Sequence, residues 1–154
     1  MTAPDIQFEY LFTLMVEVDD IVSMGEGPLG ERRLVPIIGG SFEGPRLRGR
    51  VLGGGADWQI VRGDGVVDLD ARYALEDSDG NRIKVISQGY RHGPPEVLMA
   101  LARGEEVDPH RYVFRTAMRF ETGARNLAWL NTTLAMTTAQ RHARRVDLRA
   151  WRIL

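Results

Sequence analysis

The feature that most constrains this chain is an alternation of residue character with period two, which is typical of β-strands. Residues 8–17 show it first, and both faces of this segment carry apolar side chains, so we expect a strand covered on both sides. The same pattern predicts further strands at Leu34–Ile38, Leu47–Leu52, Asp57–Val61, Val66–Leu75, Arg82–Gln88, Arg111–Thr122, Leu127–Thr137 and Arg144–Ile153. A chain with this pattern over most of its length folds around a β-sheet.

Two local signals complete the secondary structure. Asp77–Gly80 has the sequence DSDG, a strong hairpin signal because Asp and Gly tolerate positive φ. Glu96–Arg103 has helical spacing and follows Pro95, which suits a helix start. Polar residues recur within the apolar strands, which favours a barrel around a polar-lined cavity over a dry sandwich core. We therefore predict an all-β fold, a closed antiparallel up-and-down β-barrel of about eight strands with one short helix.

Glycine is concentrated in the first half of the chain. Twelve of the 17 glycines fall between Gly25 and Gly65, and Gly25–Gly30 (GEGPLG) has the composition of a loop. Glycines at this density serve tight turns and β-bulges, which allow short strands to curl into a barrel.

Composition excludes several classes of protein. A length of 154 residues with 44% apolar composition suits one domain, residues 1–154. The net charge of −1 argues against nucleic-acid binding, and the absence of cysteine excludes disulfides and thiol nucleophiles. No apolar run approaches the ~20 residues of a membrane span. The first ten residues lack the basic region of a signal peptide, so we expect a cytoplasmic location.

Several strings spread along the chain carry a family resemblance. They are Pro36–Gly44 (PIIGGSFEG), Gly49–Trp58 (GRVLGGGADW), Asp68–Tyr73 (DLDARY), Tyr90–Pro94 (YRHGP), Tyr112–Thr116 (YVFRT), Phe120–Thr122 (FET) and Trp129–Asn131 (WLN). Together they resemble a bacterial family of small barrel proteins catalogued as a domain of unknown function. That family is similar in fold to allene oxide cyclases and dirigent proteins. The resemblance implies a closed antiparallel barrel with a cavity, and it implies no settled reaction.

The first candidate site is Asp57 with Trp58, directly after the glycine run Gly53–Gly55. A glycine-rich bend brings backbone close to a ligand, and a desolvated Asp57 is suited to act as a general base. The alternative is a bulge followed by an aspartate that caps backbone amides. The run lacks the lysine of a phosphate loop and a dinucleotide fingerprint, so no cofactor is expected.

The second candidate pairs Asp70 with Arg72. Alternation puts these charges on one face of their strand and Tyr73 on the other. Either the charges face solvent, or they line a polar lumen in which Arg72 stabilises an oxyanion.

The third candidate is the segment after Arg111. Tyr112, Phe114 and Phe120 share one face, whereas Arg115 and Glu121 share the other. An aromatic lumen suits a planar hydrophobic substrate, and the alternative for the aromatic face is an ordinary core.

The remaining candidates are Trp129, Asn131 and the histidines. In a strand, Trp129 and Asn131 share a face, where Trp supplies a stacking wall and Asn orients a carbonyl; the alternative is core packing and a backbone hydrogen bond. His92 is the best acid/base candidate by its intrinsic pKa. His92, His110 and His142 have no metal-ligand spacing, so no metal site is expected.

The leading hypothesis is a cofactor-independent isomerase, cyclase or lyase that acts on a small hydrophobic oxygenated molecule. Its predicted catalytic residues are Asp57, Asp70, Arg72, Arg115 and His92, and its predicted substrate-binding residues are Trp58, Tyr73, Tyr112, Phe114, Phe120, Glu121, Trp129 and Asn131. The alternatives are a non-catalytic barrel that binds or carries a small ligand, and a structural oligomer with a filled core. Because several strands are apolar on both faces, we also expect a homodimer or a higher homo-oligomer.

Overall fold

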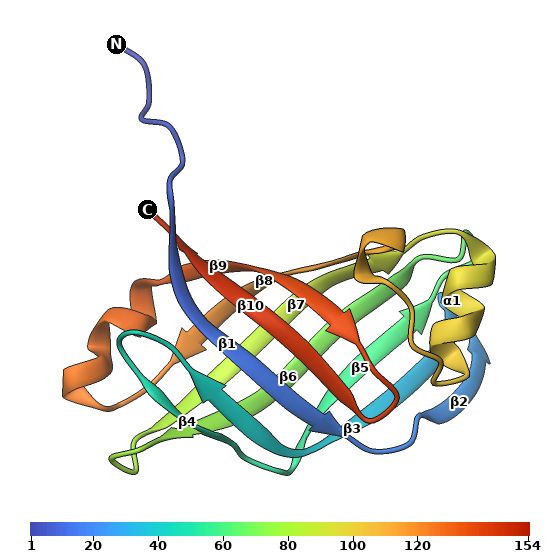
Figure 1. Ribbon diagram of the computed structural model, residues 1–154, viewed down its shortest axis with the longest axis horizontal. Helices are drawn as coiled ribbons and strands as arrows, with labels where there is room; N and C mark the ends of the chain where they lie inside the picture. The colour runs from blue at the N-terminus through green and yellow to red at the C-terminus, as the bar shows by residue number, and fades with distance from the viewer.

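Ten strands form one continuous antiparallel sheet that closes on itself (Figure 1). The computed structural model describes the whole chain, Met1–Leu154. Its strands are β1 (Phe8–Val18), β2 (Val22–Gly27), β3 (Gly30–Glu43), β4 (Arg48–Val51), β5 (Gly55–Val61), β6 (Val67–Asp77), β7 (Arg82–His92), β8 (Val113–Glu121), β9 (Leu134–Arg141) and β10 (Arg145–Ile153). The helical elements are α1 (Pro95–Ala102) and the 3₁₀ helices η1 (Pro109–Arg111) and η2 (Arg125–Thr132).

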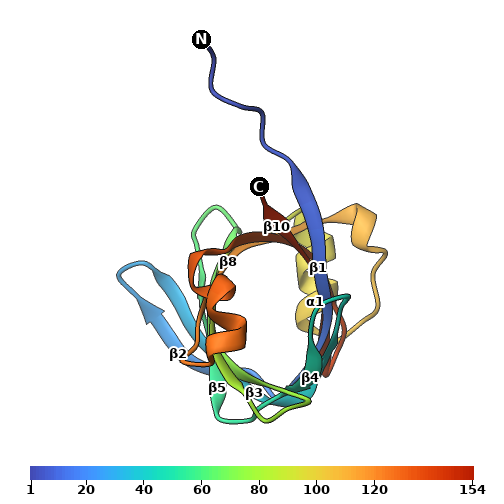
Figure 2. The same ribbon diagram turned by 90° about the vertical axis from the view of Figure 1, so that its left-hand side faces the viewer.

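The strands occupy eight positions around the barrel. Neighbours follow the order β1, β10, β9, β8, β7 and β6, and β3 then completes the ring by pairing with β1. The short strands β4 and β5 share the position between β6 and β3, and β2 pairs with β3 as an extra strand outside the ring. Figure 2 looks into the end that carries η2, where the strands trace the ring. The prediction of a closed antiparallel barrel is therefore confirmed.

The interior divides into an apolar half and a half that contains polar side chains. Near η2, Phe12 makes edge-to-face contacts with Phe42 and Phe120, with ring centroids 5.5 and 5.9 Å apart. Such contacts between buried aromatic rings stabilise a dry core. Toward α1, the inner faces of β5, β7 and β9 carry buried polar residues instead, among them Gln59, Arg91 and Arg141. A functional site is therefore expected in the half of the barrel nearer α1.

The predicted strand Leu127–Thr137 is wrong in its first half. Residues 125–132 form η2, and β9 begins only at Leu134. Leu127 and Leu130 are both buried at a spacing of three, which matches a 3₁₀ turn. The hydroxyl of Thr133 donates to the Trp129 carbonyl at 2.8 Å and ends the helix.

Two other boundaries differ from the prediction. The segment Gly25–Gly30 is only partly a loop, because β2 extends to Gly27 and pairs there with Gly30. Strand β3 does not stop near Ile38 but continues to Glu43, because its second half forms backbone pairs with neighbouring strands. It pairs with β5 in its first half and with β1 and β4 in its second half.

The outer face keeps several large apolar side chains in contact with solvent. Met15 on β1, Trp58 on β5, and Leu134 and Met136 on β9 are examples. The strand β1 is thus not covered on its outer side within one chain, and the predicted self-association stays a prediction. None of the helices has the length and apolar composition of a membrane span.

Gly40 permits the close approach of the two strands that close the barrel. It lies opposite Val16 in the β1–β3 pairing and has a φ of 135°. A Cβ at this position meets the backbone carbonyl of Met15 on β1. Any other residue therefore forces β3 away from β1 and strains its own backbone.

We expect Gly40→Ala to lower the free energy of unfolding by roughly 2–4 kcal/mol because it combines backbone strain with a steric clash. For a domain of this size, that corresponds to a fall in melting temperature of about 5–15 °C. Gly63→Ala is the matched control, since a Cβ there meets no atom within 4 Å and its φ is not positive. Thermal unfolding followed by circular dichroism measures both variants, and equal melting temperatures would contradict the role given to Gly40.

Candidate functional site

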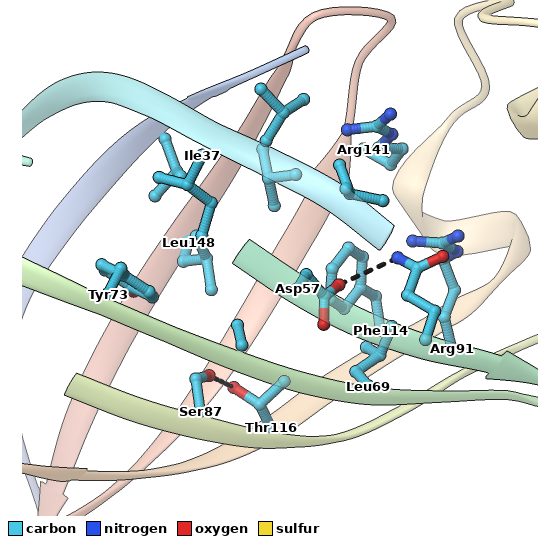
Figure 3. Close-up of a pocket in the computed structure, with 16 residues that line it drawn as sticks. Ile37, Asp57, Leu69, Tyr73, Ser87, Arg91, Phe114, Thr116, Arg141 and Leu148 are labelled. Carbon is cyan, nitrogen blue, oxygen red and sulfur yellow. Dashed lines mark hydrogen bonds between the residues drawn. The ribbon is translucent and has the colours of Figure 1, made fainter. Parts of the chain in front are cut away.

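A cavity of about 50 Å³ lies inside the barrel, between the aromatic core and α1 (Figure 3). This volume holds a few water molecules or the reacting part of a small ligand. Most of its wall is apolar, and the polar groups gather at particular points. The lining residues are Val16, Val18, Val35, Ile37, Asp57, Gln59, Leu69, Ala71, Tyr73, Ser87, Arg91, Phe114, Thr116, Arg141, Val146 and Leu148.

Asp57 is the carboxylate of the cavity. Its Oδ2 accepts a hydrogen bond of 2.8 Å from Gln59 Nε2, and its Oδ1 accepts one of 3.0 Å from the backbone N–H of Asp70. Trp58 and Gln59 on β5 have no paired residue on β6. Within this interruption of the pairing, the backbone N–H of Asp70 donates to the Asp57 side chain instead. Burial raises the pKa of Asp57 above its usual value, against the opposing effects of the Gln59 hydrogen bond and the Arg91 charge.

Three arginines surround this carboxylate. Arg33 on β3 donates from Nη2 to Gln59 Oε1 at 2.8 Å, so Gln59 bridges Arg33 and Asp57. Arg91 on β7 and Arg141 on β9 are only 6% and 8% exposed. Burial, together with the neighbouring Arg141 charge, lowers the pKa of Arg91 to about 10. Arg91 thus remains a cation at neutral pH.

No carboxylate oxygen lies within ion-pair distance of Arg91 or Arg141. Neither forms an ion pair, and the buried Nε of Arg91 has no hydrogen-bond partner. The Arg91 guanidinium lies 5.3 Å from the ring centroid of Phe114, a cation–π contact that compensates only part of its lost hydration. Figure 3 shows both guanidinium groups at the same end of the cavity as Asp57.

Hydroxyl groups form the second polar feature of the wall. Ser87 donates to Thr116 at 2.7 Å, and Thr116 in turn contacts the hydroxyl of Thr137. The hydroxyl of Tyr73 is buried and has no hydrogen-bond partner. Burial and the Asp57 charge raise the pKa of Tyr73, so its phenol stays protonated and remains a hydrogen-bond donor.

Three of the predicted site residues line the cavity, namely Asp57, Tyr73 and Phe114. Asp57 pairs with Ala71 across β5 and β6, and Tyr73 lies two residues further along the same inner face. Asp57 and Tyr73 are therefore diagonal neighbours on the barrel wall. Both alternatives for Asp57 apply in part, because it accepts a backbone amide and also faces the cavity.

The lumen interpretation of Asp70 and Arg72 is wrong. Their side chains are 38% and 50% exposed on the outer face, where Arg72 Nε contacts Asp70 Oδ1 at 3.2 Å. Alternation does not tell which face of a strand is internal, and here the apolar face with Leu69 and Tyr73 points inward. Trp58 also lies on the outer face, at 41% exposure.

The side chains of β8 also alternate between the outer face and the interior of the barrel. Arg115 and Glu121 are exposed on the outer face, and Arg115 Nη1 donates to the Phe114 carbonyl. Phe120 belongs to the aromatic core rather than to the cavity. Tyr112, just before β8, is buried beyond the polar end of the cavity, and its hydroxyl accepts the Arg141 backbone N–H at 2.9 Å.

Trp129 and Asn131 lie away from the cavity because they belong to η2 at the opposite end of the barrel. The Asn131 side chain accepts from the backbone N–H of Thr122 and donates to its carbonyl, so it fixes the chain after β8. Arg46 stacks on the Trp129 ring at 3.7 Å from its centroid. His92 is exposed at the end of β7 and does not reach the cavity.

Gln59, Arg91 and Arg141 were missed as site residues. Gln59 shares a strand face with Asp57, so it points inward if Asp57 does. Arg91 lies opposite Val67 in the β6–β7 register, so it points inward if Val67 does. The sequence shows this only once the inner face is known. No group of three or more His, Asp or Glu side chains is arranged to hold a metal ion.

Comparisons with known proteins agree with the fold and the family resemblance. Residues 6–153 match the family described as "Protein of unknown function (DUF3237)". The chain belongs to this family. It is 43% identical over 151 residues to a UPF0311 protein of Rhodopseudomonas palustris, covering 98% of this chain and 99% of that protein.

Two solved structures superpose on this chain over nearly its whole length. A protein of Acinetobacter baumannii, described as β-barrel like, superposes with a TM-score of 0.87 at 42% identity and covers 99% of both chains. A protein described as an enzyme from Penicillium herquei superposes with a TM-score of 0.75 at 22% identity, over 100% of this chain and 99% of that one. At that identity, the likeness shows the fold alone.

We expect the Asp57 carboxyl to titrate above 3.8, the ordinary value for Asp, because burial disfavours its charged form. Asp64 is the internal reference, since its hydrogen bond from Arg62 lowers its pKa below that value. Arg91→Met raises the Asp57 pKa further by removing a nearby positive charge. Carbon-13 NMR titration of the carboxyl signals measures all three, and an Asp57 pKa below 3.8 would contradict this electrostatic account.

Proposed function

We propose that this protein is a cofactor-independent enzyme, an isomerase, cyclase or lyase that moves a proton on a small hydrophobic oxygenated substrate. One observation carries the proposal. Asp57, a carboxylate with a raised pKa, and Tyr73, a neutral phenol without a partner, face the same apolar cavity. Ionisable groups whose pKa values are perturbed by burial in a shared cavity are typical of acid–base sites.

In this proposal, Asp57 is the base. Its carboxylate takes a proton from a C–H next to a carbonyl or from a hydroxyl group, and a raised pKa makes it a stronger base near neutral pH. The Gln59 and Asp70 donors hold one lone pair of each oxygen and fix the plane of the carboxylate, while further lone pairs remain free.

Tyr73 and the arginines stabilise the charge that develops. The Tyr73 hydroxyl donates to the carbonyl oxygen as it becomes an enolate, and the positive field of Arg91 and Arg141 lowers the energy of that anion. The apolar walls exclude bulk water, which strengthens these interactions. Isomerisation, cyclisation and elimination each need only these parts. The relative from Penicillium herquei, described as an enzyme, supports the view that this fold accommodates catalysis.

The second candidate is a non-catalytic barrel that binds or carries a small ligand. The small volume and largely apolar lining of the cavity favour it, since binding alone requires neither a base nor a hydrogen-bond donor. The two candidates differ in whether the ligand leaves the cavity unchanged.

In either case, a homodimer or higher homo-oligomer remains our proposal for the assembly, because apolar side chains such as Leu134 and Met136 are exposed on the outer face.

The test is proton exchange in D₂O, which detects removal of a carbon-bound proton before any net reaction. Small carbonyl compounds such as 2-butanone and 4-oxopentanoate are incubated with the protein, and deuterium incorporation is followed by NMR. We expect the wild type to accelerate exchange in at least one compound. Asp57→Asn reduces that rate by about 10²–10⁴-fold because an amide does not accept the proton.

Asp68→Asn is the matched control, the same carboxylate-to-amide change on the outer face of β6, and it keeps the wild-type rate. Arg72→Met on that face also keeps it, since its side chain does not reach the cavity. Exchange no faster than in buffer for every compound would overturn catalysis in favour of the carrier. Equal rates in Asp57→Asn and the wild type would overturn the role of Asp57.

A further inference from the structure

The Arg91 and Arg141 side chains are the least compensated charges in the molecule. Both are more than nine-tenths buried, neither forms an ion pair, and the Arg91 Nε has no partner. A buried cation without an anion is destabilising, because it has lost its hydration without gaining a charged partner. This arrangement is typical of a site that completes its interactions with a ligand.

The charges at this end of the cavity leave an excess of one positive charge near the ligand. Arg33 interacts with the charge of Glu31 and with Gln59, so it is partly compensated. The remaining groups are Arg91, Arg141 and the single carboxylate of Asp57, which interacts electrostatically with both arginines. One further monoanion therefore balances the set.

We propose that the substrate or ligand of this barrel carries a carboxylate group, which binds between Arg91 and Arg141 while its apolar remainder extends along the cavity toward Tyr73. This inference builds on the proposed function, because it assigns a chemical class to the substrate of the same site. A guanidinium fork matches the two oxygens of a carboxylate in plane and spacing. The apolar lining beyond this end, including Ile37 and Leu148, accommodates a hydrocarbon chain and not a second charge.

Arg91 also marks a route into the cavity. A groove of about 280 Å³ lies on the outside, between α1 and the β5–β6 turn, and Arg91 and Arg33 are among its lining residues. Arg91 lines the internal cavity as well, so its side chain forms part of the wall between groove and cavity. An anion in the groove therefore lies beside Arg91, and Arg141 lies on the cavity side of the same wall.

The test compares two probes of equal size, propionate and propionamide, which differ in charge. Binding is followed by NMR through the methyl signals of Val35 and Leu69, which line the cavity. We expect propionate to bind saturably and at least ten-fold more tightly than propionamide. Arg91→Met and Arg141→Met each weaken propionate binding by at least ten-fold. Arg119→Met, an exposed arginine on β8 without an ion pair, leaves it unchanged.

Folding is checked on the same variants. Replacing an unpaired buried cation by an apolar side chain of similar length removes a destabilising charge, so Arg91→Met is expected to melt no lower than the wild type. Weak binding by a folded variant then reports on recognition. Equal affinities for propionate and propionamide, or wild-type propionate affinity in Arg91→Met, would overturn the proposal. Tighter binding of inorganic phosphate than of propionate would also overturn the assignment to carboxylates.

The Asp57→Asn variant separates this inference from the proposed function. It is expected to bind propionate at least as tightly as the wild type, because a repelling carboxylate is gone, while its proton exchange is lost. If the wild type binds propionate but shows no exchange activity, the enzymatic proposal is overturned and the proposed carboxylate site is supported. If the wild type shows exchange activity but no preference for propionate over propionamide, the carboxylate site is overturned and the enzymatic proposal is supported.

Discussion

The unpaired guanidinium of Arg91 is the interaction on which the functional interpretation of this barrel depends. An arginine that is 6% exposed, next to a second buried arginine, is unfavourable in a protein interior unless something anionic compensates it. The only carboxylate nearby is Asp57, whose oxygens already accept hydrogen bonds from Gln59 and from the Asp70 amide. The cavity therefore combines a base, a phenol donor and an excess of positive charge inside apolar walls, which together suit proton transfer on an anionic substrate.

The barrel makes this arrangement possible because it closes completely. Pairing of β1 with β3 removes the sheet edge, and the interior is then shielded along its whole wall. The aromatic contacts around Phe12 fill the half near η2, so the open volume is confined to the half near α1. Polar residues from β3, β5, β7 and β9 converge there, although they are distant in sequence. The half near η2 is filled by aromatic packing, whereas the half near α1 contains the cavity and the buried charges.

The fold was predictable from the sequence because alternation, the DSDG turn and the glycine distribution all favour the same architecture. Asp57 was predictable as well, since it follows the glycine run that shapes β5. The assignment of Asp70 and Arg72 failed for a physical reason. A period of two defines two faces but does not identify the inner one, and charged residues on the outside of a barrel have the same pattern as charges in a lumen. Arg91 was overlooked beside His92, which has the more familiar catalytic side chain but points away from the cavity. The assignment of Trp129 and Asn131 to the site failed because a 3₁₀ helix replaces the expected strand.

A crystal structure of the protein with bound propionate tests the proposed carboxylate site most directly. Both carboxylate oxygens are expected to lie within hydrogen-bond distance of guanidinium nitrogens, one from Arg91 and one from Arg141, with the methyl group directed along the cavity toward Tyr73. An interior that contains only water while propionate occupies surface sites would contradict it. So would a propionate whose carboxylate lies away from both arginines.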